Sequence, residues 1–553
     1  MLYKLHKIYD TLTKKERRIF IGALLLVIAT SSLIGVRLFY TKTTVAPIEG
    51  GSYTEGVVGQ PIYINPLIAS GNDVDQDLIE IIFSNVLELA EQIKVSEDQK
   101  TWNIVLRREM LWSNGEPITS DDVIFTIETI QDPDTNSPLA ASWQGVAVER
   151  LSEREIRLTL RSPFAFFESN LKNLKIIPQH IFSAIPNANF RLSDFNLEPV
   201  GSGPYVFVKY QKRKDGFITE YNLSVNPNYT GSAPLIQSFK FKFFSNFDEA
   251  IEAFNKREID GLGGLDFVKL QNLKIPREVL EITMPRYYTI FLNSNANPAL
   301  KRPEVREALS QATDRNGIIE LVFENKALPI FGPIPSQTEG YAKDIYENEA
   351  FSLETAQKTL EAQGWEKNEE TGIYERSIGG EVVKLDFEII VPDIEFLTNT
   401  IEAIRTSWES IGIQITPVIL EPAEITRSVL KTRNYQMILF GNILNDSPDV
   451  FSFWHSSERF FPGFNLSLYE NRTLDTLLES VRGNIASTTR QKALREIQEI
   501  ILKDRPAIFL YSPNYIYAMP KNLGEFNDTT LTKPSKRFEH VESWYRRTAR
   551  VFK

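Results

Sequence analysis

The residues from Lys384 to Gly441 read KLDFEIIVPDIEFLTNTIEAIRTSWESIGIQITPVILEPAEITRSVLKTRNYQMILFG, and this stretch decides the fold class. Its first part, Lys384–Val391, is a short run rich in β-branched and apolar residues, which predicts a strand. Leu397–Ile411 repeats apolar residues at helical spacing, and Gly412 follows at the position where a helix C-cap favours glycine. A strand followed by a helix is therefore expected.

The same stretch continues with two more strands and one more helix. Ile413–Leu420 predicts the second strand, Ala423–Lys431 the second helix and Tyr435–Gly441 the third strand. The order β-α-β-α-β favours a parallel sheet with right-handed crossovers. We therefore predict an α/β fold.

A polar loop follows the third strand, and it is the first candidate site. In open α/β sheets, ligands bind just beyond the carboxyl ends of the strands. The loop 442–449 contains two amides, Asn442 and Asn445, and two carboxylates, Asp446 and Asp449. These four side chains stand where a ligand is expected.

The residues before this stretch also alternate between helical and strand-like patterns. We expect a helix over 76–93, a strand over Trp102–Leu106, a turn at 113–115 and a helix that Thr119 and Asp122 cap. Further on we expect a strand over Phe239–Phe244, a helix capped by Ser245 and Asp248 that ends near Lys256, and a short strand through Ile259. The α/β pattern therefore extends over most of the chain.

Composition excludes several classes of function. The first 42 residues contain eight basic and two acidic residues, so they carry +6 of the chain's net charge of -11 and leave -17 for the rest. Such an acidic body would repel phosphate backbones, so we expect no nucleic-acid partner. The chain has no cysteine, which excludes disulfides, thiolate metal sites and a lipid-attachment cysteine.

An uncharged segment near the N-terminus predicts a membrane anchor. The 18 residues from Ile19 to Val36 carry no charge, which is near the roughly 20 residues needed to cross a bilayer. Six basic residues precede the run, so we expect residues 1–18 in the cytoplasm, a transmembrane helix over 19–40, a tether over 41–50 and an extracytoplasmic body. A cleaved signal peptide and a buried core helix are the alternatives.

Five groups of residues, taken in order and spacing, resemble those of a known family. They are Glu55–Pro61 with Ile64–Leu67; Val95–Trp102 with Leu106-Arg107 and Trp112–Val123; Pro199–Tyr205; Arg306–Leu309 with Asp314-Arg315; and Pro506–Tyr511. From about Gly51 to about Asn522 the chain resembles the peptide-type substrate-binding proteins of ABC importers, which include oligopeptide, dipeptide and nickel receptors.

The resemblance implies a two-lobed fold of the type II periplasmic-binding-protein kind. The first lobe would span 47–285 plus 516–553 and contain an inserted subdomain over about 82–188, and the second lobe would span 286–515. Hinges would lie near Tyr287-Tyr288 and over Tyr511–Tyr517. The resemblance also implies a receptor that encloses a short peptide and delivers it to ABC permease subunits. We expect the body to be monomeric.

The resemblance further implies site residues. Peptide-binding members hold the ligand's α-ammonium group with an aspartate whose counterpart here is Asp446, a pairing that gives a charge-assisted bond in a closed cleft. Two positions depart from the family pattern: Ile443 replaces a usual tryptophan, and Asp449 is followed by Val450 instead of proline. The ligand class is thus less constrained than the fold.

Other ligand contacts are weaker predictions. Trp454, Tyr287 and Tyr288 are candidate pocket walls, with a core role as the alternative for each, and Asn442 and Asn445 are candidates for contacts from the loop. A cation should hold a peptide's terminal carboxylate. Arg405, Arg427 and Arg433 are possible, and the sequence selects none of them.

No pattern of residues indicates an enzyme. The four histidines are far apart, and the chain has no H-E-x-x-H, G-x-S-x-G or Walker A motif. We therefore expect no catalytic residue, no metal and no cofactor. Two alternatives to a peptide receptor remain: the same fold binding a sugar or a metal chelate, and a ligand sensor that does not transport.

Overall fold

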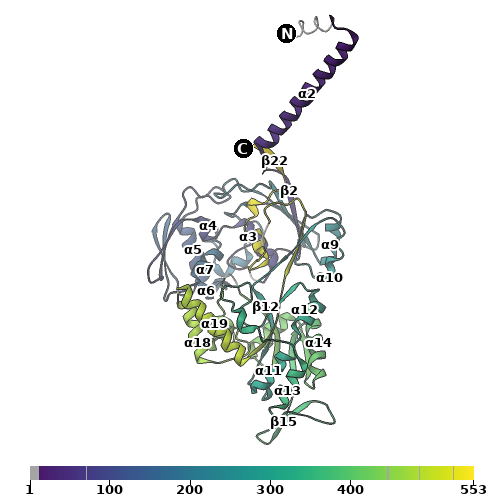
Figure 1. The fold of residues 1–553 in the computed structure, drawn as a ribbon. Coiled ribbons are helices and arrows are strands. Elements are labelled where there is room, and N and C mark those ends of the chain that lie inside the picture. The colour runs from purple at the N-terminus through teal and green to yellow at the C-terminus, as the bar shows by residue number, and fades with distance from the viewer. Residues whose placement is uncertain (1–10, 70, 445–446, 485, 527–528) are drawn as a thin grey trace.

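The computed structural model describes residues 11–69, 71–444, 447–484, 486–526 and 529–553. The chain forms two α/β lobes, and helix α2 (Lys14–Lys42) projects away from them (Figure 1). One lobe is built on a seven-stranded sheet and the other on a six-stranded sheet. The predicted fold class is confirmed.

The six-stranded sheet contains the stretch that predicted the fold. Its order is β13 (Ala327–Pro329), β20 (Ala507–Pro513), β12 (Arg286–Leu292), β19 (Met437–Ile443), β17 (Asp386–Pro392) and β18 (Gln414–Leu420). Strand β17 pairs in parallel with both β18 and β19, as predicted. The other pairs are antiparallel, so the sheet as a whole is mixed.

Helix α14 (Glu395–Ser410) is the crossover that the apolar spacing predicted. It buries Leu397, Ile401, Ile404 and Trp408 against its lobe, and Gly412 follows it with φ +93°, a conformation that glycine adopts without strain. The second predicted helix is present as an unbroken helical segment, formed by α15 (Pro422–Glu424), a π-helical part over Ile425–Val429 and α16 (Leu430–Thr432). Helices α18 (Arg472–Gly483) and α19 (Ser487–Asp504) lie on the same lobe (Figure 1).

The seven-stranded sheet draws strands from both ends of the chain. Its order is β11 (Glu278–Ile282), β21 (Tyr515–Met519), β10 (Gly261–Gly263), β2 (Ser52–Val58), β9 (Ser238–Phe244), β8 (Ile218–Val225) and β7 (Tyr205–Lys212). The chain passes to the six-stranded sheet between β11 and β12, and it returns between β20 and β21. The exact lobe boundaries and hinges stay predictions.

A separate four-stranded sheet accompanies the first lobe. Its order is β3 (Ala90–Val95), β4 (Thr101–Leu106), β6 (Glu155–Thr159) and β5 (Ala147–Ser152). Helices α5 (Ser120–Gln131), α6 (Ala140–Trp143) and α7 (Phe167–Asn173) belong to the same part of the chain. The predicted capping box of α5 is present: the Thr119 side chain accepts from the Asp121 amide, and Asp122 accepts from the Thr119 amide at 2.9 Å.

The single helix predicted over 76–93 is wrong. Helix α3 (Asp73–Ile82) ends at Ile82, a short helix α4 (Val86–Leu89) follows, and strand β3 begins at Ala90. The carbonyl of Ile82 accepts from the Gly203 amide at 2.8 Å, which takes the chain out of the helix. A Cβ on Gly201 would lie 2.1 Å from the same carbonyl oxygen, so the Gly-Ser-Gly turn permits this close approach.

Two further details differ from the sequence predictions. Helix α9 (Phe247–Asn255) is capped by Asn246, whose side chain accepts from the Glu249 amide, and not by Ser245. Asparagine and serine are both good N-caps, so their adjacency made the choice ambiguous. The following strand, β10, begins at Gly261, two residues after the predicted end.

A buried ion network fixes the last segment of the first lobe. Arg537 donates to Asp77 on α3 and to Glu55 on β2 at 2.5–3.2 Å, and all three side chains are almost completely buried. Burial raises the pKa of the Glu55 and Asp77 carboxyl groups. The Arg537 guanidinium acts in the opposite direction and lowers both pKa values, but burial has the larger effect. Tyr517 also donates to Glu55 at 2.8 Å, so strands and helix share one polar centre.

Helix α2 is the one helix in the described part of the chain that is long and apolar enough to cross a membrane. It buries none of its residues. The region predicted as a tether contains strand β1 (Thr43–Pro47), which pairs antiparallel with β22 (Thr548–Phe552). A two-stranded sheet therefore lies between the helix and the first strand of the body, β2.

Candidate functional site

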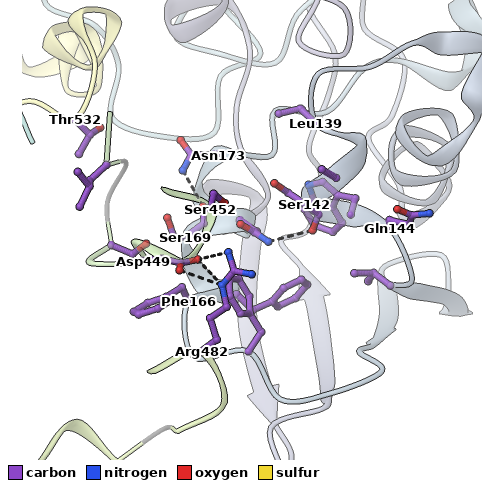
Figure 2. A pocket seen from close by; sticks show the side chains of 18 of the residues that line it. Leu139, Ser142, Gln144, Phe166, Ser169, Asn173, Asp449, Ser452, Arg482 and Thr532 are labelled. Atoms are coloured by element: carbon purple, nitrogen blue, oxygen red, sulfur yellow. Dashed lines mark hydrogen bonds and ion pairs between the residues drawn. The ribbon is translucent and has the colours of Figure 1, made fainter. Parts of the chain in front are cut away.

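A cavity of about 830 Å³ lies where residues of both lobes meet (Figure 2). Residues of the second lobe form one wall: Ile443, Leu444, Ser447, Asp449, Ser452, Phe453, Glu458 and Arg482. Residues of the first lobe form the other: Pro66, Ala69, Gln76, Ile79, Glu80, Leu139, 141–146, 160–164, 166–167, 169–170, Asn173, Lys175, Thr532, Lys533 and Lys536. The cavity opens just beyond the carboxyl end of β19, where the sequence predicted a ligand.

An aspartate–arginine pair occupies the second-lobe wall. Arg482, near the end of α18, donates through Nε to both carboxylate oxygens of Asp449 at 2.9 and 3.0 Å, and its NH2 group lies 2.9 Å from Oδ2 (Figure 2). The guanidinium also lies 3.7 Å from the centroid of the Phe451 ring. This geometry neutralises Asp449, so its carboxylate is already occupied.

The two lobes touch beside this pair. The Ala165 amide donates to the Arg482 carbonyl at 2.7 Å, which joins the first-lobe segment to the end of α18. Phe166 is buried in a cluster that otherwise consists of second-lobe side chains, and the Arg490 guanidinium lies 5.7 Å from its ring centroid. The structure therefore has the lobes in contact on one side of the cavity.

Three lysines give the first-lobe wall a positive charge. Lys175 and Lys536 each lie 3.1 Å from the same oxygen of Glu80, and Lys533 donates to Gln76 at 3.4 Å. Lys175, Lys536 and Glu80 are buried, and Lys536 also lies 3.8 Å from a carboxylate oxygen of Glu539. We call Lys175, Lys533 and Lys536 the lysine cluster.

The lysine cluster predicts a specific pH dependence of stability. Burial alone would raise the pKa of Glu80, but the three lysines hold it at about 2, below its ordinary value of 4.5. A carboxyl group with a lowered folded pKa stabilises above its unfolded pKa and loses that contribution as pH falls through the folded pKa. Glu80→Gln should therefore lower the free energy of unfolding most above pH 4.5, and the gap to wild type should narrow toward pH 2.

Denaturant unfolding of wild type and Glu80→Gln between pH 7 and pH 3 checks this expectation. Glu354→Gln is the matched control, because Glu354 forms an exposed pair with Lys358. A gap for Glu80→Gln that stays constant over that range would contradict the assignment.

The structure brings two of the sequence-predicted site residues together. The Asn442 side chain donates to the Tyr287 hydroxyl at 3.1 Å, and both are buried. Trp454 is buried against Phe291 and Phe509, and Tyr288 packs against Phe396. Asn442, Tyr287, Tyr288 and Trp454 are not among the residues that line the cavity, so their ligand contacts stay predictions. Asn445 and Asp446 lie outside the described residues.

The three arginines considered for a terminal carboxylate lie elsewhere. Arg405 forms an exposed pair with Glu402, Arg433 donates to backbone carbonyls, including that of Arg459 at 3.0 Å, and Arg427 is exposed. Sequence reasoning missed Arg482 and the lysine cluster. The only sequence signal for Arg482 was its place near the C-terminal end of a helix. Its partner, Asp449, lies 33 residues earlier in the chain.

The chemistry of the cavity suits binding. Its walls combine aromatic side chains, serines and amides with acidic and basic side chains. In the part of the chain that the structure describes, no three His, Asp or Glu side chains gather to hold a metal ion. Polar and apolar residues line the cavity in similar numbers, so it offers a ligand both hydrogen-bonding groups and apolar contact surface.

Comparison with known proteins gives the family. Residues 86–460 match the model of bacterial extracellular solute-binding proteins, family 5 Middle. The chain is 24% identical over 525 residues to the oligopeptide-binding protein AppA of Bacillus subtilis, covering 91% of this chain and 93% of AppA. It is also 24% identical over 457 residues to the probable D,D-dipeptide-binding periplasmic protein DdpA of Escherichia coli, covering 79% and 81%.

Solved structures share the fold. AppA from Bacillus subtilis, in complex with a nonapeptide, matches with a TM-score of 0.72 at 22% identity and covers 90% of this chain and 99% of its own. NikZ from Campylobacter jejuni, in complex with Ni(L-His), matches with a TM-score of 0.71 at 22% identity and covers 89% and 99%. The relatives are binding proteins and not enzymes, as the sequence predicted. The family model spans more than half of the chain, and the protein therefore belongs to the extracellular solute-binding proteins of family 5, the substrate-binding proteins of ABC importers.

Proposed function

We propose that this solute-binding receptor takes short peptides into the cavity between its lobes and presents them to ABC permease subunits. The observation that carries the proposal is the cavity itself, which has walls from both lobes next to the loop that follows β19. Its relatives AppA and DdpA are named for oligopeptides and D,D-dipeptides.

The charges of the two walls support a ligand that is charged at both ends. Asp446, on the second-lobe loop, is proposed to hold the peptide's α-ammonium group, because the other carboxylate of that loop, Asp449, is paired with Arg482. The lysine cluster on the first lobe supplies the positive potential that suits carboxylates. Asn442, Asn445, Trp454, Tyr287 and Tyr288 remain proposed contributors around the loop.

Ligand binding would then act as a population shift between open and closed lobes. A ligand that contacts both walls interacts more strongly with the closed state, and this difference sets how far the equilibrium moves. The proposed lobes are 47–285 plus 516–553, with the insert over about 82–188, and 286–515. The chain would bend where it crosses between the sheets, near Tyr287-Tyr288 and over Tyr511–Tyr517.

The proposal includes the cellular arrangement. Helix α2 would remain as a single-pass anchor, with residues 1–18 in the cytoplasm and a monomeric body outside the membrane. Its length and its uncharged run support a membrane span, and the six cations before the run support this orientation.

Native mass spectrometry of the full chain, released from detergent micelles, tests the proposed ligand. We expect the protein to retain peptides from a mixed pool and to retain neither glucose nor the nickel–histidine chelate. If the protein retained the chelate and no peptide, its ligand class would be a metal chelate, and the receptor role would still stand. Retention of glucose alone would favour a sugar receptor.

A further inference from the structure

A two-stranded ribbon connects the apolar helix to the body. Strand β1 follows α2 directly and pairs with β22, with Thr43 opposite Phe552. Figure 1 shows β22 beside the end of α2. The Lys553 amide donates to the Lys42 carbonyl at 2.9 Å. The ribbon is therefore attached to the last turn of the helix and carries residues from a distant part of the chain to the same place.

This ribbon has no core of its own. Phe552, Val45 and Val551 are 78%, 55% and 40% exposed, so none of them is buried in a core. An isolated pair of strands is marginally stable in water, and exposed apolar side chains of this size are poorly placed there. These side chains would be more stable in an apolar or interfacial environment than in water.

The ribbon and the helix end are also basic, in contrast to the acidic body. Residues 37–48 and 545–553 contain six cations and no acidic residue. Arg546 pairs with Asp260 at 2.8 Å, whereas Arg550 lies 4.1 Å from the Tyr40 ring centroid and donates to Thr43 Oγ1 at 3.2 Å. Lys42 and Lys553 are exposed beside them. The cations therefore gather on the side of the body that faces the helix.

The distance along α2 gives the depth of this cluster. An α-helix rises 1.5 Å per residue, so Lys42 lies about 9 Å beyond Val36, where the uncharged run ends. The headgroup layer of a bilayer extends about 5–8 Å beyond the hydrocarbon core. If the run crosses the membrane, Tyr40, about 6 Å beyond Val36, lies at the level of the headgroups. Lys42, with Phe552 and Lys553 beside it, lies at the outer edge of that layer, within reach of long side chains.

We propose that the β1–β22 ribbon is a second membrane-contact element, which binds anionic phospholipid headgroups with Lys42, Arg550 and Lys553 and places Phe552 in the interface. This inference rests on the proposed anchor. Aromatic and basic side chains are the ones that favour this layer. By joining the last strand to the end of the anchor, the ribbon would hold the acidic body at a fixed height above an anionic surface.

Fluorescence quenching in nanodiscs tests the proposal with the full chain. The protein has no cysteine, so single labels can be placed by Val551→Cys on the ribbon, Val382→Cys on the exposed strand β16 (Glu381–Lys384) and Ser32→Cys in the apolar run. Nitroxide lipids labelled at the headgroup or the acyl chain act as quenchers. The nanodiscs contain phosphatidylcholine with or without phosphatidylglycerol.

We expect headgroup quenching at residue 551 to exceed that at residue 382 severalfold and to increase with phosphatidylglycerol. Arg550→Gln together with Lys553→Gln should remove that increase. Acyl-chain quenching at residue 32 together with no headgroup quenching at residue 551 would overturn the ribbon proposal and leave the anchor. No acyl-chain quenching at residue 32 would overturn both the anchor and the ribbon proposal. Headgroup quenching at residue 551 that does not change with phosphatidylglycerol would overturn the assignment of anionic headgroups as the ligand.

Discussion

Arg537→Met is expected to lower the free energy of unfolding by about 3–5 kcal/mol, because it leaves two buried carboxylates without their counter-charge. The guanidinium is 2% exposed and pairs with Glu55 and Asp77, which are 0% and 2% exposed. Methionine keeps much of the side chain's length and its contact with apolar neighbours. The loss therefore reports the unpaired charges more than a cavity.

Differential scanning calorimetry and urea unfolding of the full chain measure this loss. Arg213→Met is the matched control, since Arg213 forms an exposed pair with Asp215 and such pairs contribute about 0–1 kcal/mol. Adding Glu55→Gln and Asp77→Asn to Arg537→Met should restore part of the stability. A loss for Arg537→Met no larger than that of the control would show that the network does not hold the last segment to α3.

Asp446→Asn is expected to weaken peptide binding by about 2–5 kcal/mol, since it removes the proposed charge partner of the ligand's ammonium group. It should also remove the preference for a peptide with a free amino group over its N-acetylated form. Isothermal titration calorimetry with both forms of one retained peptide measures the affinity and the preference together.

Asp449→Asn is the matched control, three residues along the same loop. Its carboxylate is already bound by Arg482, so the variant should keep the preference for a free amino group even if its affinity changes. The opposite pattern, with the preference lost in Asp449→Asn and kept in Asp446→Asn, would transfer the ammonium-binding role to Asp449.

Local patterns were sufficient to predict much of the second lobe. The spacing of apolar residues over Leu397–Ile411 and the glycine after it gave helix α14 within two residues, and the order of elements gave the parallel pairs of β17. The Thr119–Asp122 capping box was likewise predicted, because both of its partners lie within one helical turn. Such features depend on neighbours in sequence.

Features that depend on distant partners were not predictable from one sequence. The break after Ile82 arises from a hydrogen bond with Gly203, and the ion network joins Arg537 to residues more than 450 positions away. Strand β1 forms because β22 pairs with it across the whole chain. A periodicity in one segment carries no information on such contacts.

The candidate site was likewise predictable where it depends on local sequence and was missed where it depends on distant contacts. The loop after β19 was located in the sequence, since the carboxyl end of a parallel strand follows from the predicted topology. The first-lobe wall was missed, because Lys175 and Lys536 are far apart in the sequence and can be recognised as one charged cluster only when the fold places both against Glu80. The placement of Trp454 and Tyr287 in the core could not be distinguished from a pocket role by residue type alone.

Photo-crosslinking of a retained peptide tests the central claim, that the ligand lies between the two lobes, most directly. A peptide with one benzoylphenylalanine is bound to the full chain, irradiated, digested and mapped by mass spectrometry. We predict crosslinks on both walls of the cavity, within residues 139–175 and within residues 443–458. Crosslinks confined to one lobe, or to residues outside the cavity, would contradict the account.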